Sequence, residues 1–406
     1  MMFWEKKFSQ WITRMRHQTV LPLRVILWNG LQFDLAEVTP KVTVRLPGPS
    51  SLTYLLNPSL KNLARAYVEG KLHVEGQLQS VIEMANALAE KSFSSTGRLG
   101  QLFRPLAHTR SQDKQAIEYH YDVSNDFYQK FLDPAMVYSC AYFEEGNESL
   151  ATAQEKKIDH ILRKIAVKPG DRLLDIGCGW GALLIRAAEK FGAQCTGITL
   201  SENQYTLATQ RVAHAGLSEK IQIHLMDYRD VGGKFDRITS VGMFEHVGLK
   251  NLPEYFTKIA SLLTDDGLAL NHGITTTNTD HSTARYGAGE FIEHYVFPGG
   301  ELPHIGRVLT AMQEGGLEAR DVENLRRHYA QTCTLWAENF ENHGEKIRTL
   351  IDERRYRIWR VYLAGCAHAF RNDWISLNQI VCSKAGRDAN TLAWSRKYMY
   401  PESDSH

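Results

Sequence analysis

The hydrophobic positions after about residue 113 recur with the periods of strands and helices in turn. Residues 154–216 hold a helical stretch, an apolar run, a glycine-rich turn, a second helical stretch, another apolar run, a turn and a third helical stretch. The alternation continues through 220–230, 235–248, 252–263 and 267–275. This pattern predicts an α/β fold with a doubly wound parallel sheet. After about residue 275 the alternation stops, and we expect extra helices and a hairpin that cap the sheet.

The pattern before residue 90 has shorter elements. Residues 22–37 place a Trp-Asn-Gly turn between two short apolar runs, which predicts a hairpin. Residues 41–51 predict a further strand that ends at Pro and Gly, and the segments 60–76 and 78–90 predict helices. These elements together indicate a small α+β unit.

Residues 92–112 are rich in Ser, Gly and Arg and show little periodicity, which predicts a linker or mobile loop. A chain of 406 residues is too long for one ordinary core. We therefore predict an N-terminal helper domain with its linker at 1–112, a candidate for membrane or dimer contact. The catalytic domain, with a Rossmann-like sheet and a C-terminal helical cap, is predicted at 113–406.

The composition is that of a globular protein, with 43% hydrophobic and 23% charged residues. The formal net charge is +1, so no overall field favours nucleic acid. The six cysteines lack Cys-x-x-Cys or Cys/His ligand spacing, which favours a reducing cytoplasm and predicts no metal site. No apolar run reaches the roughly 18 residues that span a bilayer. The N-terminus also lacks the continuous apolar run of a signal peptide.

Residues 1–20 predict an amphipathic helix with two interpretations. Its apolar stripe consists of Trp4, Phe8, Trp11, Ile12 and Met15. Its cations are Lys6, Lys7, Arg14 and Arg16. Such a helix can lie on an anionic membrane surface. It can also pack on its own domain or on a partner subunit, which is the commoner use of an apolar stripe.

A glycine-rich loop follows one of the predicted strands. Asp175, Gly177, Gly179 and Gly181 form the pattern D-x-G-x-G-x-G between a strand and a helix. Glycines there allow a tight turn and a close approach of ligand to backbone. The pattern differs from the dinucleotide fingerprint G-x-G-x-x-G and resembles the loop of class I methyltransferases. That resemblance implies contact with the amino-acid end of S-adenosylmethionine (SAM).

Polar residues also follow the next two predicted strands. Gln204 lies where such folds meet a ribose, although Ser201 and Glu202 there can simply cap a helix. Asp227 and Tyr228 offer an acid and an aromatic ring, a pair that commonly brackets an adenine. Ligands of doubly wound sheets bind at the carboxyl ends of the strands. We therefore expect these residues to bind SAM.

Several segments resemble the cyclopropane-fatty-acyl-phospholipid synthase family and the related mycolic acid cyclopropane synthases. They are "EYHYDVSNDFY", "MVYSCAYF", "LLDIGCGWGAL", "GITLSENQ", "YRDVGGKFDRITSVGMFEHVG", "LNHGI", "YVFPGGELP" and "AGCAHAFRNDWISLNQIVCSK". They span about residues 115–385 and follow the order of the family. The resemblance implies transfer of the SAM methyl group to the cis double bond of a phospholipid acyl chain, followed by loss of a proton and ring closure.

The resemblance also implies site residues. A bound bicarbonate ion would act as the base, held by Cys140 (through its backbone), Glu245, His272, Ile274 (through its backbone) and Tyr329. SAM contacts would come from Tyr138, Ser139, Gly177, Gly179, Thr199, Gln204 and Tyr228. Glu245 and His246 follow a predicted strand. We expect Glu245 to orient the anion and His246 to point elsewhere, into a structural hydrogen bond.

The sequence is also compatible with other functions. A family member can leave a methylene or methyl branch in place of a ring. A small-molecule methyltransferase or a SAM-binding scaffold could use the same fold. For a phospholipid substrate we expect a cytoplasmic protein, peripheral on the inner face of the bacterial membrane, with a homodimer suggested by the family and no nucleic-acid partner.

Overall fold

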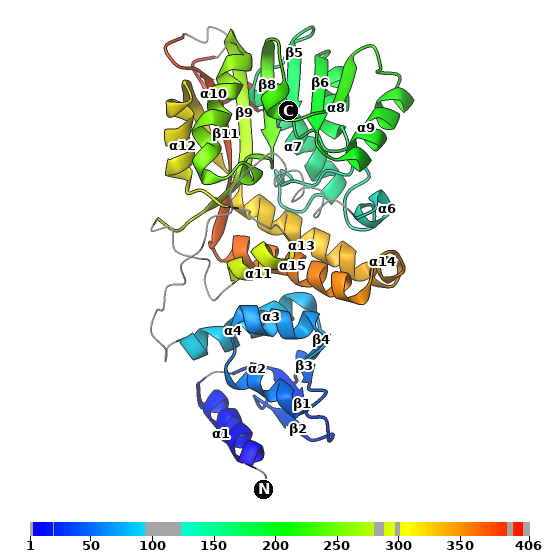
Figure 1. Cartoon of the computed structure of the whole chain (residues 1–406), viewed down its shortest axis with the longest axis vertical. Helices are drawn as coiled ribbons and strands as arrows, with labels where there is room; N and C mark the ends of the chain where they lie inside the picture. Colours follow the sequence, from blue (N-terminus) through cyan, green and yellow to red (C-terminus); the bar gives the residue numbers. More distant parts are fainter. Residues whose placement is uncertain are drawn as a thin grey trace, which may run out of the picture. The chain divides into compact units, whose positions relative to one another are not determined.

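The computed structural model describes residues 3–18, 20–93, 123–279, 288–296, 301–387 and 393–400 (Figure 1). The chain forms two compact units. The first comprises residues 1–104, 282–298 and 340–368, and the second comprises 105–281, 299–339 and 369–406. Most of the predicted linker, 92–112, lies outside the described residues.

The first unit contains a four-stranded sheet in the order β2-β1-β3-β4. Its strands are β1 (Leu23–Ile26), β2 (Gln32–Asp34), β3 (Val42–Arg45) and β4 (His73–Gly76). The predicted hairpin is confirmed, since β1 pairs antiparallel with β2. The predicted helix over 60–76 is wrong at its end, because residues 73–76 pair with β3 as a strand. Local propensity did not reveal that distant pairing.

The helices of the N-terminal part cover this sheet. They are α1 (Phe3–Gln18), α2 (Leu52–Leu56), α3 (Leu60–Val68) and α4 (Leu78–Phe93), with a 3-10 turn at Pro49–Ser51. The apolar stripe of α1 is buried: Phe8, Trp11, Ile12 and Met15 belong to the same core as the strands. Lys7 and Arg14 lie on the exposed face of α1. Packing on its own domain is therefore the observed use of the stripe.

Two later segments join the first unit, which the predicted linear boundary at residue 112 did not anticipate. They include α11 (Ala288–Tyr295), α14 (Gly344–Leu350) and much of α15 (Glu353–Arg371). Val68 of α3 packs with Phe291, Tyr295 and Ile358 in one apolar cluster. Side chains distant in sequence thus complete this core, which a reading along the chain cannot detect.

The second unit is built on a seven-stranded sheet in the order β10-β11-β9-β8-β5-β6-β7 (Figure 1). The strands are β5 (Arg172–Ile176), β6 (Gln194–Thr199), β7 (Ile221–Leu225), β8 (Phe235–Val241), β9 (Leu263–Thr276), β10 (Leu317–Asn324) and β11 (Ile375–Lys384). Strands β5 to β9 pair in parallel, and β11 and β10 add antiparallel strands. The predicted doubly wound sheet is confirmed. The late strands extend the sheet, whereas we expected a hairpin that caps it.

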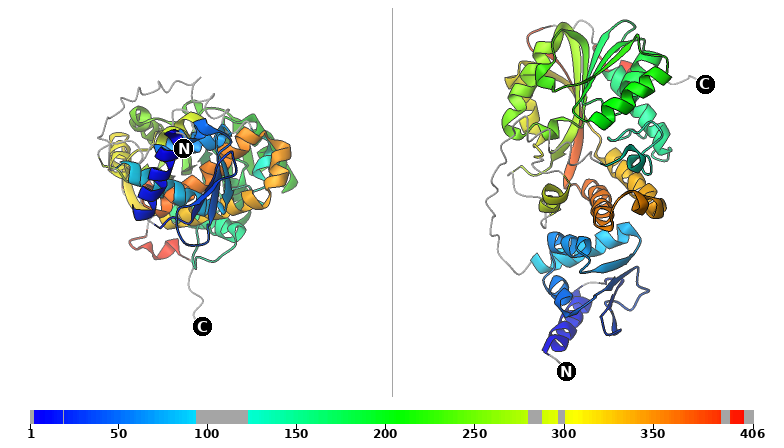
Figure 2. Two further views of the ribbon diagram at one scale, coloured as in Figure 1. Left: turned by 90° about the horizontal axis from the view of Figure 1, so that it is seen from below. Right: turned by 45° about the vertical axis from the view of Figure 1, so that its right-hand side comes forward.

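Helices cover both faces of this sheet (Figure 2). They are α6 (Asn125–Tyr128), α7 (Leu150–Lys164), α8 (Ala182–Lys190), α9 (Glu202–His214), α10 (Leu252–Leu262), α12 (Ile305–Glu314) and α13 (Arg326–Asn342). Successive side chains of β5 point to opposite faces of the sheet, which explains why helices pack on both faces. Leu173 packs in the cluster formed with α7 and α8, whereas Leu174 and Ile176 pack in the cluster formed with α10 and α12.

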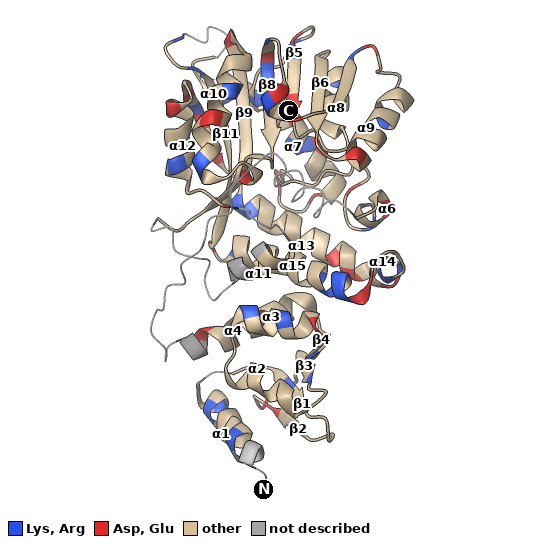
Figure 3. Cartoon of the chain, viewed as in Figure 1, with Lys and Arg blue, Asp and Glu red and all other residues tan. Residues whose placement is uncertain are grey.

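The strand order reverses at β5, where β6 lies on one side and β8 on the other. Doubly wound sheets bind ligands at such a reversal, beyond the carboxyl ends of the strands. Acidic and basic residues are interspersed along the helices, for example along α12 and α14 (Figure 3). Among the described helices, none is long and apolar enough to cross a membrane.

Candidate functional site

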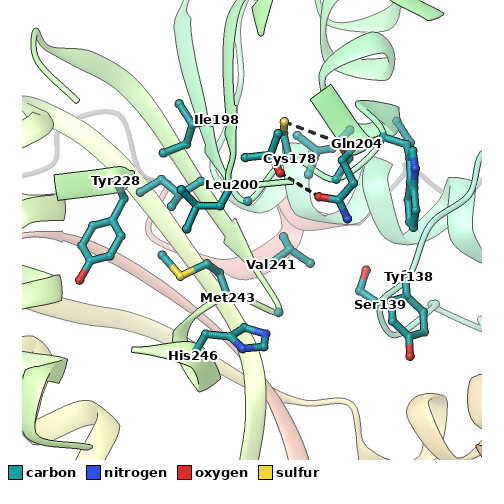
Figure 4. A pocket seen from close by; sticks show the side chains of 18 of the residues that line it. Tyr138, Ser139, Cys178, Ile198, Leu200, Gln204, Tyr228, Val241, Met243 and His246 are labelled. Atoms are coloured by element: carbon teal, nitrogen blue, oxygen red, sulfur yellow. Dashed lines mark hydrogen bonds between the residues drawn. The ribbon is translucent and has the colours of Figure 1, made fainter. Parts of the chain in front are cut away.

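A pocket lies at the carboxyl ends of β5, β6 and β8, at the expected reversal of strand order. The predicted residues that line it are Tyr138, Ser139, Gly177, Gly179, Thr199, Gln204, Asp227 and Tyr228. Tyr138 and Ser139 lie on one side of the pocket, and Tyr228, Met243 and His246 lie on the other (Figure 4). The sequence-predicted SAM residues are thus brought together, with the exception of Asp175.

The glycine loop shapes the floor of the pocket. Gly177 and Gly179 have φ values of +82° and +55°, which side chains rarely adopt. The amides of Gly177 and Cys178 donate to the carbonyl oxygen of Ile198 at 3.0 and 2.9 Å. A Cβ atom on Gly177 would lie 3.3 Å from Cγ of Met243. The loop is therefore a cradle that a side chain would fill, as a ligand in close backbone contact requires.

Asp175 lies behind the loop and supports it. Its Oδ1 atom accepts a hydrogen bond from the Thr239 hydroxyl at 2.7 Å, which joins β5 to β8. Burial raises the pKa of Asp175 to about 6. Asp175 is not among the described residues that line the pocket. Its role in cofactor binding, predicted from the loop motif, would therefore be indirect.

The residues after β6 form a polar corner. The Thr199 hydroxyl donates to Oε1 of Gln204 at 2.8 Å, a contact drawn in Figure 4. The Ser201 hydroxyl caps α9 by accepting from the amide of Gln204. Because Thr199 uses the amide oxygen of Gln204, the Gln204 NH2 group remains the donor at the pocket wall. This arrangement suits a ligand hydroxyl or carboxylate.

At the end of β7 the predicted acid has a partner within the chain. Arg229 donates to both carboxylate oxygens of Asp227 at 2.8 and 2.6 Å. The Arg229 guanidinium also lies over the Tyr228 ring, with Cζ 5.3 Å from the ring centroid. The sequence did not predict Arg229 at the site. Tyr228 therefore offers one ring face to the guanidinium, and Asp227 is held by an ion pair.

Glu245 and His246 follow β8, and the structure shows where each side chain points. Glu245 and His246 lie in the 3-10 turn Phe244–His246 that follows β8. Glu245 is directed to the amide of Ile274, whereas His246 lines the pocket (Figure 4). In a 3-10 turn, successive side chains point about 120° apart. The two residues therefore diverge as expected, and His246 lines the pocket.

A buried polar group lies on β9 and the turn after β8. The amide of Ile274 donates to Oε1 of Glu245 at 2.7 Å, and burial raises the pKa of Glu245 to about 7. His272 is fully buried, which lowers its pKa well below the usual range. The amide NH2 of Gln379 lies 3.2 Å from Nδ1 of His272, so Nδ1 accepts and Nε2 carries the proton.

Three atoms of this group have no hydrogen-bond partner within the described part of the chain. They are Oε1 of Gln379, Oε2 of Glu245 and Nε2 of His272. Buried polar atoms are normally paired, because an unpaired one costs roughly 1–3 kcal/mol. Of the Glu245 and His272 atoms, one accepts and the other donates. A small ligand with both an acceptor oxygen and a hydroxyl group fits this pair.

Cys140 and Tyr329 lie next to this group through backbone contacts. Ile274 is opposite Leu377 in the pairing of β9 with β11. The amide of Leu325 donates to the Leu377 carbonyl at 2.8 Å, and the Leu325 carbonyl accepts from the amide of Tyr329 at 3.0 Å. The same carbonyl lies 3.8 Å from Sγ of Cys140. These contacts link Cys140 and Tyr329 to Ile274 through the backbones of Leu325 and Leu377.

Cys140 is fully buried, and burial raises the pKa of its thiol. A thiol in that state is a poor nucleophile. The Tyr329 ring packs against Phe370 and Trp336, with centroid distances of 4.5 and 5.9 Å. Trp336 in turn lies 5.1 Å from the ring of Tyr138, which lines the pocket. An aromatic wall formed by Tyr138, Trp336, Tyr329 and Phe370 therefore extends from the pocket.

Comparisons with known proteins place the chain in a family. Residues 108–380 match the mycolic acid cyclopropane synthetase family. The chain belongs to this family. Residues 10–97 match a domain family of unknown function.

Similar proteins include lipid enzymes. A probable fatty acid methyltransferase of Pseudomonas putida is 47% identical over 383 residues, which are 94% of this chain and 96% of that protein. The cyclopropane synthase MmaA2 from Mycobacterium tuberculosis is 35% identical with a TM-score of 0.65, and the match covers 68% of this chain and 99% of MmaA2.

A second similar structure contains a ligand. It is the mycolic acid cyclopropane synthase CmaA1 complexed with SAH and CTAB, which is 36% identical with a TM-score of 0.64. That match covers 67% of this chain and 98% of CmaA1. SAH, S-adenosylhomocysteine, is the product that SAM leaves after methyl transfer. As a member of the mycolic acid cyclopropane synthetase family, the chain is a SAM-dependent methyltransferase.

The residues of this family member fit SAM. The glycine cradle and the aromatic ring of Tyr228 both line the pocket. Sequence reasoning missed Lys157, Arg229 and the pocket side of His246. Lys157 had a detectable signal. It lies among the apolar residues Ile158 and Ile161 of the predicted helix, where a lysine is unusual.

Proposed function

We propose that the chain transfers the methyl group of SAM to the cis double bond of an unsaturated phospholipid acyl chain and then closes a cyclopropane ring. The observation that carries the proposal is the buried pair formed by Oε2 of Glu245 and Nε2 of His272. Methylation of an amine or a hydroxyl releases a proton from nitrogen or oxygen, which water can also accept, whereas here the proton leaves carbon. Deprotonation of a new methyl group needs a base in a dry site.

The proposed reaction consists of methyl transfer followed by ring closure. The π electrons of the alkene form a bond to the methyl carbon, and the carbon–sulfur bond breaks with its electrons on sulfur, which gives SAH. A carbocation remains beside the new methyl group. Loss of a proton from that methyl group leaves an electron pair, which bonds to the cationic carbon and closes the ring. The acyl chain gains one CH2 unit.

The residues present fit a bicarbonate ion, which would supply the base. His272 would donate from Nε2 to an oxygen of the ion, and Glu245 would accept its hydroxyl through Oε2. Contributions from Tyr329, Cys140 and Ile274 would be supported by the backbone contacts that link these residues through Leu325 and Leu377. Charge-assisted hydrogen bonds of this kind fix both position and orientation. Glu245 would orient the ion and leave the proton transfer to it.

The aromatic wall suits the cationic intermediate. Tyr138 and Trp336 pack together beside the pocket, and Tyr329 packs on the far side of Trp336. The faces of such rings attract a positive charge by roughly 0.5–2 kcal/mol each. None of these rings offers a strong nucleophile that would capture the cation. The proposed site would thus stabilise the cation without consuming it.

A second candidate product is a methylene or methyl branch. The observation in its favour is the Pseudomonas putida relative, which covers 94% of this chain and is named as a probable fatty acid methyltransferase. A branch shares the methyl transfer with the leading proposal. It differs in the fate of the carbocation, which would form a branch and not a ring.

We also propose that the enzyme works at the inner face of the bacterial membrane, where phospholipid acyl chains are found. The exposed cations Lys7 and Arg14 support attraction to an anionic surface. The buried Phe8 and Trp11 do not serve as anchors in this arrangement. A homodimer remains a prediction from the family resemblance.

The test is incubation of the full chain with SAM and vesicles of an unsaturated phosphatidylglycerol, followed by mass analysis of the acyl chains. The proposal expects a gain of one CH2 unit that resists catalytic hydrogenation. A gain that hydrogenation reduces would indicate a methylene branch. An unmodified acyl chain would contradict the proposal. Removal of bicarbonate from the buffer should slow the reaction, and its return should restore the rate.

A further inference from the structure

A buried lysine lies at the wall of the pocket. Lys157 of α7 is 2% exposed and lines the pocket beside Ser139. Its ammonium donates to the Ser139 hydroxyl, with 2.7 Å between Nζ and Oγ. Lysines are rarely buried without a paired charge or a function. None of the roles considered above uses Lys157.

Helix α7 holds the Ser139 segment at two points. One turn before Lys157, the side-chain amide of Gln154 donates to the carbonyl of Ser139 at 2.8 Å. An ammonium group can only donate hydrogen bonds, so the Ser139 hydroxyl accepts from Lys157. The hydroxyl must then direct its own proton away from Nζ. Because Ser139 lines the pocket, an acceptor in the pocket can receive that proton.

The position of the Lys157 ammonium group indicates which end of SAM lies beside it. Asp175 and Asp133 are the carboxylates that interact with Lys157, and Asp175 precedes the glycine loop. Tyr228, by contrast, lies on the opposite wall (Figure 4). SAM carries an α-carboxylate and an α-ammonium at its amino-acid end, and a cationic sulfonium. The carboxylate is its one anionic group, so a buried ammonium attracts the carboxylate and repels the other two groups.

We propose that Lys157 is a positioning residue for SAM, which holds the Ser139 hydroxyl so that it donates to the α-carboxylate of the cosubstrate. The ammonium also places a positive charge at that end of the pocket. This inference rests on the pocket being the SAM site. Burial lowers the pKa of Lys157 to about 8, and Cys140, Asp133 and Asp175 oppose the shift. Lys157 therefore remains mostly charged at neutral pH.

Two ligands separate this role from a purely structural one. SAH has the α-carboxylate, whereas methylthioadenosine has the same nucleoside and sulfur without the amino-acid end. Lys157→Met in the full chain replaces the ammonium by an apolar group of similar length. We expect calorimetry to show about a tenfold or greater loss of SAH affinity, with the affinity for methylthioadenosine changed by less than about threefold. Ser139→Ala should give the same selective loss, and the double variant should add little to it.

Lys156 is the matched control, because its ammonium pairs with Glu144 and Glu148 at 2.6 and 3.1 Å outside the pocket. Lys156→Met should leave both affinities unchanged. If Lys157→Met weakens both ligands equally, or neither, the proposal is wrong. Should that variant fail to fold, Ser139→Ala decides, since equal effects on the two ligands overturn the proposal. A wild-type chain that binds neither ligand would instead contradict the SAM site itself, and the inference with it.

Discussion

The backbone amide of Ile274 donates to the carboxyl group of Glu245, with 2.7 Å between the nitrogen and Oε1. This contact joins β9 to the turn that follows β8. It fixes one carboxyl oxygen and leaves the other without a hydrogen-bond partner among the described residues. Burial raises the pKa of the same group to about 7. Glu245 is therefore rigidly placed and close to its titration point at physiological pH.

The first prediction concerns turnover. Glu245→Gln keeps the shape of the side chain but weakens its hydrogen bond with the proposed base. We expect kcat to fall by about 100-fold or more, while the Kd for SAH changes by less than about threefold, because Glu245 does not line the described pocket. Rate measurements and calorimetry check the two effects. The exposed Glu254→Gln on α10 is the control. Parallel losses of turnover and SAH binding would indicate a structural role.

The second prediction concerns stability and pH. Unfolding returns the pKa of Glu245 from about 7 towards 4.5. Between these values the folded state holds a proton that the unfolded state has released, so stability falls as the pH rises. Above pH 7, ionisation of Glu245 makes the free energy of unfolding lower than at pH 4 by up to roughly 3 kcal/mol, at 1.36 kcal/mol per unit of pKa difference.

Glutamine resembles the protonated carboxyl group and does not ionise. We therefore expect Glu245→Gln to raise the free energy of unfolding relative to wild type at pH 8, and to have little effect at pH 4. Denaturant titrations without SAM or bicarbonate at both values check this. A variant that is less stable than wild type at pH 8 would contradict the burial of an ionisable carboxyl group.

The third prediction concerns the glycine cradle. Gly177→Ala imposes a side chain at φ +82° and places its Cβ against Met243. Gly216→Ala imposes similar backbone strain at φ +69° in open space after α9. Each change should cost about 1–2 kcal/mol of stability. Only Gly177→Ala should weaken SAH binding. If both variants bind SAH like wild type, the loop does not contact the ligand.

The fourth prediction separates two roles of α1. Trp11 is 6% exposed and stacks on Phe8, with ring centroids 5.5 Å apart. Trp11→Ala should therefore destabilise the N-terminal unit by roughly 3–5 kcal/mol. The combined change of Lys7 and Arg14 to Glu should leave stability near wild type and reduce sedimentation with anionic vesicles. Vesicle binding that is insensitive to this charge reversal would contradict an electrostatic role of α1.

The parallel sheet and the glycine loop were predictable, because their signals are local. An apolar run marks β5, β-branched residues mark β6 and β8, and the loop pattern directly follows β5. The carboxyl ends of parallel strands meet at one edge, so Gly177, Thr199 and Asp227 could be grouped from sequence alone. The strand over residues 73–76 could not, because its pairing with β3 spans about thirty residues.

The side-chain partners of the site depended on tertiary contacts. Asp227 was predicted to meet the ligand and lines the pocket, but its ion pair with Arg229 was not predicted. Lys157 is a surface residue by type and becomes buried only when α7 packs on the Ser139 segment. The sequence alone does not predict that Arg229 pairs with Asp227 or that Lys157 contacts Ser139.

The central claim is that the new methyl group loses a proton to a base that Glu245 orients. The most direct measurement is the mass of acyl chains after reaction with SAM whose methyl group carries three deuterium atoms. The account predicts that the product retains two of them in a group that resists hydrogenation. Retention of all three deuterium atoms would show that the methyl group is never deprotonated, and would contradict the account.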